Sequence, residues 1–297
     1  MIRLDAASVL LQWATGGLFF LWVTTRLRLL GVGYGWLMRS TYLLMAVAAF
    51  GIGRRFDPVL VRDVCSALVA LAAGVALFVS WQRRKAGVSG QLALHEERSE
   101  RVAAMTGIER NVGHEPAEEA GNGPARGEGP EFPPALDLVA PAIGAVGLVS
   151  AGLAAGDPAA LSVARMLVGA MFMGAVSDGM LLGHWYLVQP GLPRDPILEL
   201  VKWTTLLWPF ELAVMLWPTG MFSAINGTID DGWQGLLTWF WVASSVTTLG
   251  LLIVTRLALR ERAYSAVMAA TGLLYLAILT AFGQDLVARA ILSPGAG

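Results

Sequence analysis

Residues 161–187 read LSVARMLVGAMFMGAVSDGMLLGHWYL, an apolar run that is interrupted by the ionisable side chains Arg165, Asp178 and His184. An α-helix of about 20 mostly apolar residues is long enough to cross the hydrocarbon core of a bilayer. This run exceeds that length. We therefore predict a transmembrane helix that carries ionisable groups inside it.

Seven other apolar stretches accompany this one. Hydrophobic residues make up 56% of the 297-residue chain and charged residues 14%, whereas soluble domains carry about 25% charged residues. We predict an all-α fold, a polytopic transmembrane bundle of about eight helices. The stretches cover residues 7–25, 36–53, 60–81, 136–155, 161–187, 197–217, 235–255 and 264–284.

The chain divides into three parts. Residues 1–81 hold the first three predicted helices and residues 135–297 hold the other five. The connection between them, residues 82–134, is expected to begin with an amphipathic helix, because Leu92 and Val102 belong to a set of apolar residues spaced among charged ones. Its second half, residues 113–134, is rich in Gly, Pro and Glu and is predicted to be disordered.

Basic residues predict the orientation, because short cytoplasmic loops of membrane proteins are enriched in arginine and lysine. With both termini outside, the inner loops hold most of the basic residues, although Arg54 and Arg55 fall on the other side. The connection is then cytoplasmic. Arginine far outnumbers lysine, which favours a bacterial plasma membrane as the location. The inner-loop basic residues are Arg26, Arg28, Arg83, Arg84, Lys85, Arg194, Arg256, Arg260 and Arg262.

Several classes of partner are disfavoured. A net charge of -1 and the lack of a basic face argue against nucleic acid. The segment that starts at His95 has Ser99 in place of a second zinc ligand, so no metal site is predicted. The histidine content also excludes a bis-histidine haem inside the membrane, while a His/Met pair and other cofactors stay open. The expected partners are membrane lipids and, as a possibility, other membrane subunits.

The fifth and sixth predicted helices carry most of the ionisable groups inside apolar runs. They are joined by the short proline-rich segment 189–196, which predicts an antiparallel hairpin. Residues of the two helices that are equally far from the turn then lie at equal depth. The pairs that this places together are Asp178 with Lys202, His184 with Glu199, and Arg165 with Glu211.

The cytoplasmic half of this hairpin is the predicted site. Arg39 and Asp137 fall on the same side of the membrane and are expected to converge with the hairpin residues there. Such groups can shift protons or bind substrate, and they can equally be ion pairs that only hold helices together. Both interpretations stay open. By contrast, Asp63 with Arg62, and Asp285 with Gln284, are expected to be solvated near the outer ends.

Two further features bear on function. Pro209 should bend the sixth helix close to Glu211, as a gating helix requires. The sequence His184, Trp185, Tyr186 could instead contact a quinone or a lipid headgroup. We therefore expect a small-solute or proton-linked transporter, with a subunit or accessory of a membrane redox or biosynthetic complex as the alternative. Whether the chain is an enzyme is left open.

Overall fold

The computed structural model describes residues 2–89, 93, 130–189, 192–218, 220–261 and 263–293. The amphipathic helix expected within the connection, and most of the segment expected to be disordered, lie outside these residues. Throughout the described ranges the regular structure is helical. The all-α fold is confirmed.

Eight helices of 16 or more residues make up the described part of the bundle. They are α1 (Ala6–Thr25), α2 (Val32–Phe56), α3 (Leu60–Gln82), α5 (Val139–Ala154), α6 (Ala159–Val188), α7 (Asp195–Leu216), α9 (Leu236–Ala258) and α10 (Tyr264–Leu292). Short helical turns add η1 (Arg84–Ala86), η2 (Pro134–Leu138) and α8 (Met221–Ile225).

Seven of the described helices are long and apolar enough to cross a membrane, with η2 and α5 counted together. The chain is therefore a polytopic membrane protein. The exception is α7, which carries Glu199, Lys202 and Glu211 along its length. It nevertheless packs against α6 and α9 as part of the same bundle.

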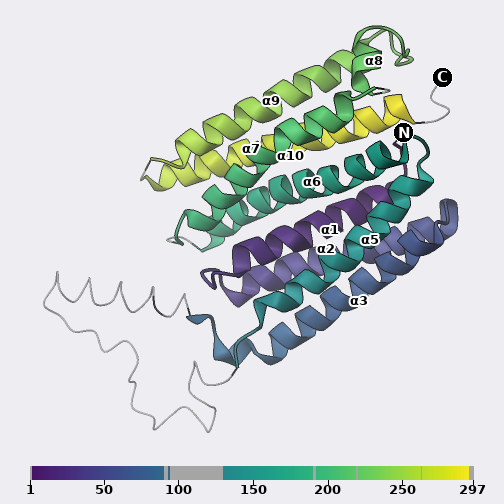
Figure 1. The fold of residues 1–297 in the computed structure, drawn as a ribbon. Coiled ribbons are helices and arrows are strands. Elements are labelled where there is room, and N and C mark those ends of the chain that lie inside the picture. Colours follow the sequence, from purple (N-terminus) through teal and green to yellow (C-terminus); the bar gives the residue numbers. More distant parts are fainter. Residues whose placement is uncertain are drawn as a thin grey trace, which may run out of the picture.

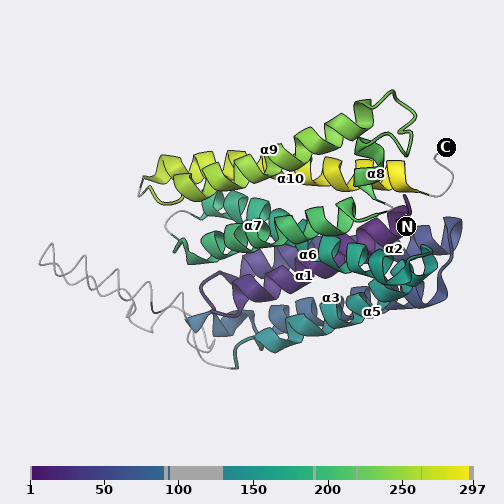
Figure 2. The ribbon, with the colours of Figure 1, turned by 45° about the horizontal axis from the view of Figure 1, so that its top comes forward.

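The helices lie side by side in an elongated bundle, and α6 is at its centre (Figures 1 and 2). On one side α6 contacts α1 and α5, and on the other it contacts α7 and α10. The start of α1 and the end of α10 lie at one end of the bundle, where the amide of Leu4 donates to Oγ of Ser293, and we call it the terminal end (Figure 1). We call the opposite end, where α3 leads into the connection, the connection end.

Glycines let α1 and α6 touch along their backbones. A Cβ atom added to Gly174 would lie 2.2 Å from the carbonyl carbon of Gly16, and one added to Gly16 would lie 1.7 Å from the carbonyl oxygen of Ala170. Small residues at helix crossings are how membrane helices gain van der Waals contact without a hydrophobic driving force. Any larger side chain at these two positions would push the central helices apart.

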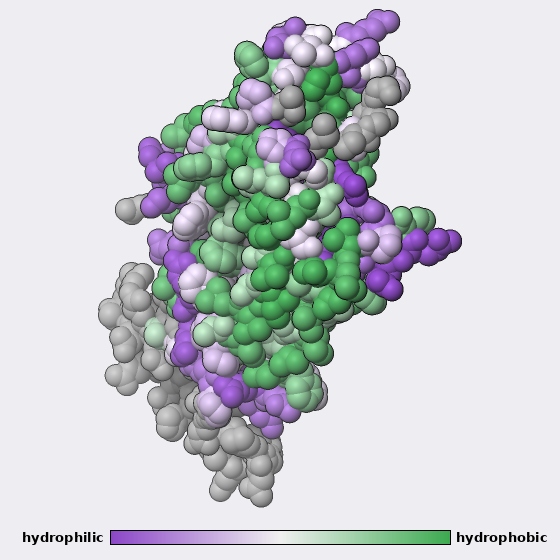
Figure 3. All heavy atoms as spheres, turned by 45° about the vertical axis from the view of Figure 1, so that its right-hand side comes forward, coloured by the Kyte–Doolittle hydropathy of each residue, from purple (hydrophilic) through white to green (hydrophobic). Residues whose placement is uncertain are grey.

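The surface of the bundle is apolar across its middle. Figure 3 shows hydrophobic side chains covering most of one face, with hydrophilic ones gathered toward its edges. Leu71, Val146, Phe210 and Leu279 are each more than half exposed. Side chains of this kind on long apolar helices are suited to contact lipid tails.

Candidate functional site

Asp178 lies at the centre of the bundle, on the buried face of α6. The hydroxyl of Tyr42, on α2, donates a hydrogen bond to its Oδ1. Its Oδ2 has no hydrogen-bond partner among the residues that the structure describes. Asp178 is fully buried, and no basic side chain in the described ranges forms a direct ion pair with it. Ionisable groups inside a membrane bundle are rare and commonly functional, so Asp178 is a candidate site residue.

The predicted pair of Asp178 with Lys202 is wrong. Residues Ile197, Val201 and Thr204 define the face of α7 that packs into the bundle, and Lys202 lies off that face and is exposed. The hairpin places Asp178 and Lys202 on neighbouring helices, but it does not set the rotation of α7 about its axis. Depth alone therefore could not determine which side chains meet.

The predicted pair of His184 with Glu199 does not form either. Glu199 pairs with Arg26, with 2.5 Å between carboxylate and guanidinium. His184 is exposed on the outer surface of α6. There its Nδ1 lies 3.2 Å from the hydroxyl of Tyr275, on α10.

The two aromatic residues after His184 make their hydrogen bonds near the turn between α6 and α7, and not with His184. Trp185 donates from its indole to Oε1 of Gln189, at 3.2 Å, and Tyr186 donates to the carbonyl of Pro193. Both bonds stay within the turn between α6 and α7 and stabilise it. His184, Trp185 and Tyr186 therefore do not form one common site.

Arg39 and Asp137 form an ion pair with each other, and the described contacts do not join this pair directly to Lys202, His184 or Glu199. The guanidinium of Arg39 donates two parallel bonds to the carboxylate, at 2.8 and 2.6 Å, and both side chains are buried. This bidentate pair joins α2 to η2 near the connection end. Tyr42 lies one helical turn from Arg39 on α2, so the pair is close to Asp178 along that helix.

Glu211, on α7, is the second buried carboxyl group of interest. Its Oε2 has no hydrogen-bond partner in the described part of the chain, and the side chain is 1% exposed. Gly169, on α6, leaves room for it: a Cβ added there would lie 3.7 Å from Oε2 and 2.0 Å from Nε2 of Gln12. Gln12 and Glu211 therefore enter the same space between α1, α6 and α7.

Arg165 was expected to pair with Glu211. The two interact electrostatically, but they do not form a direct ion pair. Instead Arg165 donates to the carbonyls of Val214, at 2.8 Å, and Trp217, at 3.1 Å. The last carbonyls of a helix have no partner within that helix, so Arg165 caps the end of α7.

Asp285 and Gln284, which the sequence predicts to be solvated, are both buried, and Asp285 completes this space together with Arg289. Arg289 donates to Oδ2 of Asp285 at 2.7 Å, to Oε1 of Gln12, and to the carbonyl of Arg3 at 3.1 Å. Arg289 and Asp285 are both buried and both interact electrostatically with Glu211. We call Gln12, Glu211, Asp285 and Arg289 the Glu211 cluster. Its members come from α1, α7 and α10.

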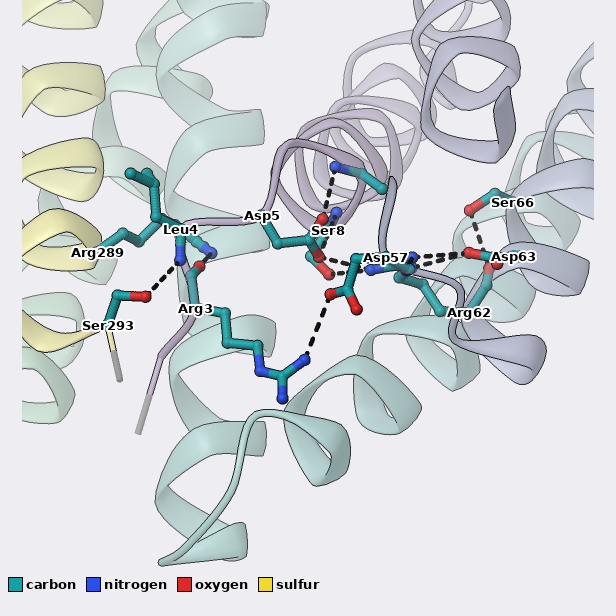
Figure 4. Close-up of polar contacts among 11 residues, drawn as sticks. Arg3, Leu4, Asp5, Ser8, Asp57, Arg62, Asp63, Ser66, Arg289 and Ser293 are labelled. Atoms are coloured by element: carbon teal, nitrogen blue, oxygen red, sulfur yellow. Dashed lines mark hydrogen bonds and ion pairs between the residues drawn. The ribbon is translucent and has the colours of Figure 1, made fainter. Parts of the chain in front are cut away.

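Arg62 is also buried, contrary to expectation. It donates to Asp5 at 2.6 Å, to Asp63 at 2.9 and 3.0 Å, and to the carbonyl of Asp57 at 2.5 Å. Figure 4 shows Arg62 between Asp5 and Asp63, with Arg3 reaching Asp57 beside them. This network ties the start of α1 to the start of α3, and its charges are paired.

Sequence reasoning missed the Glu211 cluster for an identifiable reason. The last apolar stretch was predicted to end at residue 284, whereas α10 continues to Leu292. Asp285 and Arg289 were therefore placed outside the membrane. Their four-residue spacing, which puts opposite charges on one helix face, was the signal that could have extended the helix.

Two buried carboxyl groups without a direct ion pair are the chemical core of this arrangement. In the described ranges, no group of three His, Cys, Asp or Glu side chains could hold a metal ion. No protein-family model, curated protein or solved structure matches the chain. Its function is therefore inferred from these residues.

Proposed function

We propose that this protein is a proton-linked transporter of a small solute, in which Asp178 and Glu211 take up and release protons. The observation that carries the proposal is the burial of both carboxyl groups without a direct ion pair in the described structure. Ionisable groups inside membrane bundles are expensive to keep and commonly mark ion or proton pathways.

Polar side chains of α1 and α6 lie between the levels of the two carboxyl groups. Gln12 is beside Glu211, and the next residue, Trp13, donates from its indole to Oγ of Ser177 at 2.6 Å. Ser177 directly precedes Asp178. From Gly169, beside Glu211, to Asp178 the rise along α6 is about 13 Å. The two carboxyl groups are thus about 13 Å apart along an axis that crosses roughly 30 Å of hydrocarbon.

Pro209 makes α7 easier to bend. It lies inside α7, two residues before Glu211, and a proline there removes one backbone hydrogen bond of the helix. A local bend at Pro209 would carry Glu211 toward or away from Gln12. We propose that this movement changes the side of the membrane to which Glu211 is accessible.

The proposed setting is a bacterial plasma membrane with the connection end in the cytoplasm. Arg26, Arg84 and Lys85 lie at that end, and the connection itself would then be cytoplasmic. Membrane lipids are the proposed partners.

Proton flux tests the function. The purified full chain would be placed in liposomes that contain a pH-sensitive dye, and a membrane potential would be applied with and without a panel of amino acids, sugars and organic acids. We expect internal acidification that falls at least tenfold in Glu211→Gln and in Asp178→Asn. Lys202→Gln is the matched control, because Lys202 is exposed, and it should keep the wild-type rate. Absence of flux under every condition, or equal flux in all variants, would overturn the proposal.

A second candidate function rests on His184. Its contact with Tyr275 lies on the exposed surface of the bundle, where a quinone or another membrane subunit could reach it. A subunit of a redox or biosynthetic complex would copurify with a partner or a coloured cofactor in mild detergent. Loss of that partner in His184→Ala, with no proton flux by the isolated chain, would favour this function over transport.

A further inference from the structure

A small cavity opens at the connection end, and neither Asp178 nor Glu211 lines it. Its volume is about 50 Å³, which is room for a few atoms of water size. Arginine side chains from three parts of the chain line it: Arg28 before α2, Arg39 on α2 and Arg83 at the end of α3. The cavity suits a compact anionic group better than a whole solute.

One acidic residue, Glu131, lines this cavity. The carboxylate of Glu131 accepts from Arg28 at 2.6 Å, and from the backbone amide and the hydroxyl of Ser89 at 3.1 and 3.4 Å. Arg83 donates to the backbone carbonyl of Glu131 at 2.8 Å. A guanidinium, an amide and a hydroxyl around one anion are the donors that proteins use to bind phosphate oxygens.

Arg28 is held in an unusual backbone conformation. Its φ angle is +56°, in the left-handed region that residues other than glycine seldom occupy. Such a conformation persists where the surroundings require it, and it is frequent at binding sites. Here it accompanies the placement of Arg28 at the edge of the cavity.

Arg39 lines the cavity, but its charge is not available to a bound anion. Asp137 already neutralises it, and the ring of Phe132 lies 4.2 Å from its guanidinium carbon. Arg28 and Arg83 are therefore the residues that would balance an incoming anion. Glu131 is the only acidic side chain of the described residues that would compete with it at the cavity mouth.

The surroundings place the cavity at the depth of lipid headgroups. Trp81, at the end of α3, is half exposed, and the guanidinium of Arg84 lies 4.4 Å from its ring. Tryptophan and arginine are enriched where a membrane protein passes from lipid tails to water.

We propose that this cavity binds a phosphate group, and that Glu131 occupies the site until a phosphate displaces it. The phosphate could belong to an anionic phospholipid or to a free phosphate ion, because both present the same oxygens. This site is separate from Asp178 and Glu211, and the proposal does not depend on the transport function.

Binding to the purified full chain in neutral detergent tests the site. The probes are a short-chain phosphatidylglycerol, the matching diacylglycerol without phosphate, and inorganic phosphate. We expect phosphatidylglycerol or phosphate to bind and diacylglycerol not to bind. Binding of phosphatidylglycerol alone would identify a lipid headgroup as the source, and binding of both would identify phosphate in general.

Variants make the test specific. Arg28→Gln removes a charge-assisted hydrogen bond and should weaken binding about tenfold, whereas Glu131→Gln removes the competing charge and should strengthen it about tenfold. Arg84→Gln is the control, because Arg84 is basic and nearby but does not line the cavity; it should change affinity less than twofold. Thermal unfolding of each variant checks that it is folded. Equal affinity in all folded variants, or weaker binding in Glu131→Gln, would overturn the proposal.

Discussion

Tyr42 on α2 donates its hydroxyl hydrogen to Asp178 on α6, and both side chains are completely buried. Asp178 has no other hydrogen-bond donor among the described residues. The bond therefore links two helices, and it also supplies the hydrogen-bonding environment of a carboxyl group that has no basic partner there.

Tyr42→Phe tests this link. The change leaves a buried carboxyl group without its donor, which costs about 1–3 kcal/mol of folding free energy. We also expect slower proton flux in liposomes. Unfolding in detergent micelles, followed by tryptophan fluorescence, measures the first effect. Tyr275→Phe is the matched control, because that hydroxyl bonds an exposed histidine; equal stability losses in the two variants would contradict the assignment.

Gly174→Leu tests the contact between α1 and α6. A Cβ at Gly174 meets backbone atoms of Gly16, which cannot rotate away as a side chain could, so we expect a loss of about 3 kcal/mol or more. The control is Gly250→Leu on α9, where nothing lies within 4 Å of an added Cβ. Gly250→Leu should fold as the wild type does. If Gly174→Leu is equally stable, the two central helices do not touch as described.

Arg289 and Asp285 form a buried pair whose disruption should be severe. Arg289→Met leaves the Asp285 carboxylate buried and unpaired, which typically costs about 3–5 kcal/mol. The double variant Arg289→Met with Asp285→Leu should recover part of that loss, because Asp285 is no longer a buried unpaired carboxylate, while Gln12 still lacks its donor. Arg3→Met is the comparison: its pair with Asp57 is exposed, and its removal should cost less than about 1 kcal/mol.

We predict that the titration of Asp231, at the terminal end, makes the folding stability depend on pH. Its carboxylate accepts hydrogen bonds from the amide of Thr238, and also from the amides of Trp233 and Gly235 and the hydroxyl of Thr238. These bonds lower the pKa of Asp231 from 3.8 to about 2, and the bond from the Thr238 amide has the largest effect. Because the pKa is lower in the folded state, the stabilisation is complete above about pH 5 and is lost as the pH falls toward 2.

The variant Asp231→Asn measures this stabilisation. The difference in stability between it and the wild type should be constant above about pH 5 and shrink between about pH 4 and pH 2. Asp230→Asn is the control, since Asp230 accepts one bond, from the amide of Gly232. A difference that grows on acidification would show that the sign is wrong.

The orientation can be read from thiol labelling. In a Cys65→Ser background, Phe56→Cys places a thiol at the terminal end and Gln82→Cys places one at the connection end, both at exposed positions. An impermeant thiol reagent added to intact cells should label the first and reach the second only after permeabilisation. The reverse pattern would place the connection outside the cytoplasm.

The fold was largely predictable because apolar length is a local property. Long apolar stretches identified the helices. They also identified α7, although its charges keep it out of the set of helices that are apolar enough to span a membrane. The boundary of α10 was missed because Asp285 and Arg289 resemble the end of a span when their partners are unknown. One of those partners, Gln12, is 277 residues away in the chain.

The candidate site was less predictable because it depends on helix rotation. Asp178 and Glu211 were recognised as important, since a carboxylate in an apolar run stands out. Their surroundings were not, because Tyr42 and Gln12 carry no charge and lie on helices that the hairpin argument did not include. Lys202 shows the converse: it has the right depth and charge and faces outward.

The bond from Arg289 to Gln12 also sets an order of events during synthesis. The first helix enters the membrane with Gln12 lacking this donor, and the bond can form only after α10 has been translated. The contact between α1 and α10 must therefore form after the network of Arg62, whose partners all lie in or beside the first three helices. A translation product that stops before α10 would expose Gln12 and Glu211 to the membrane interior, which makes it a recognisable substrate for quality control.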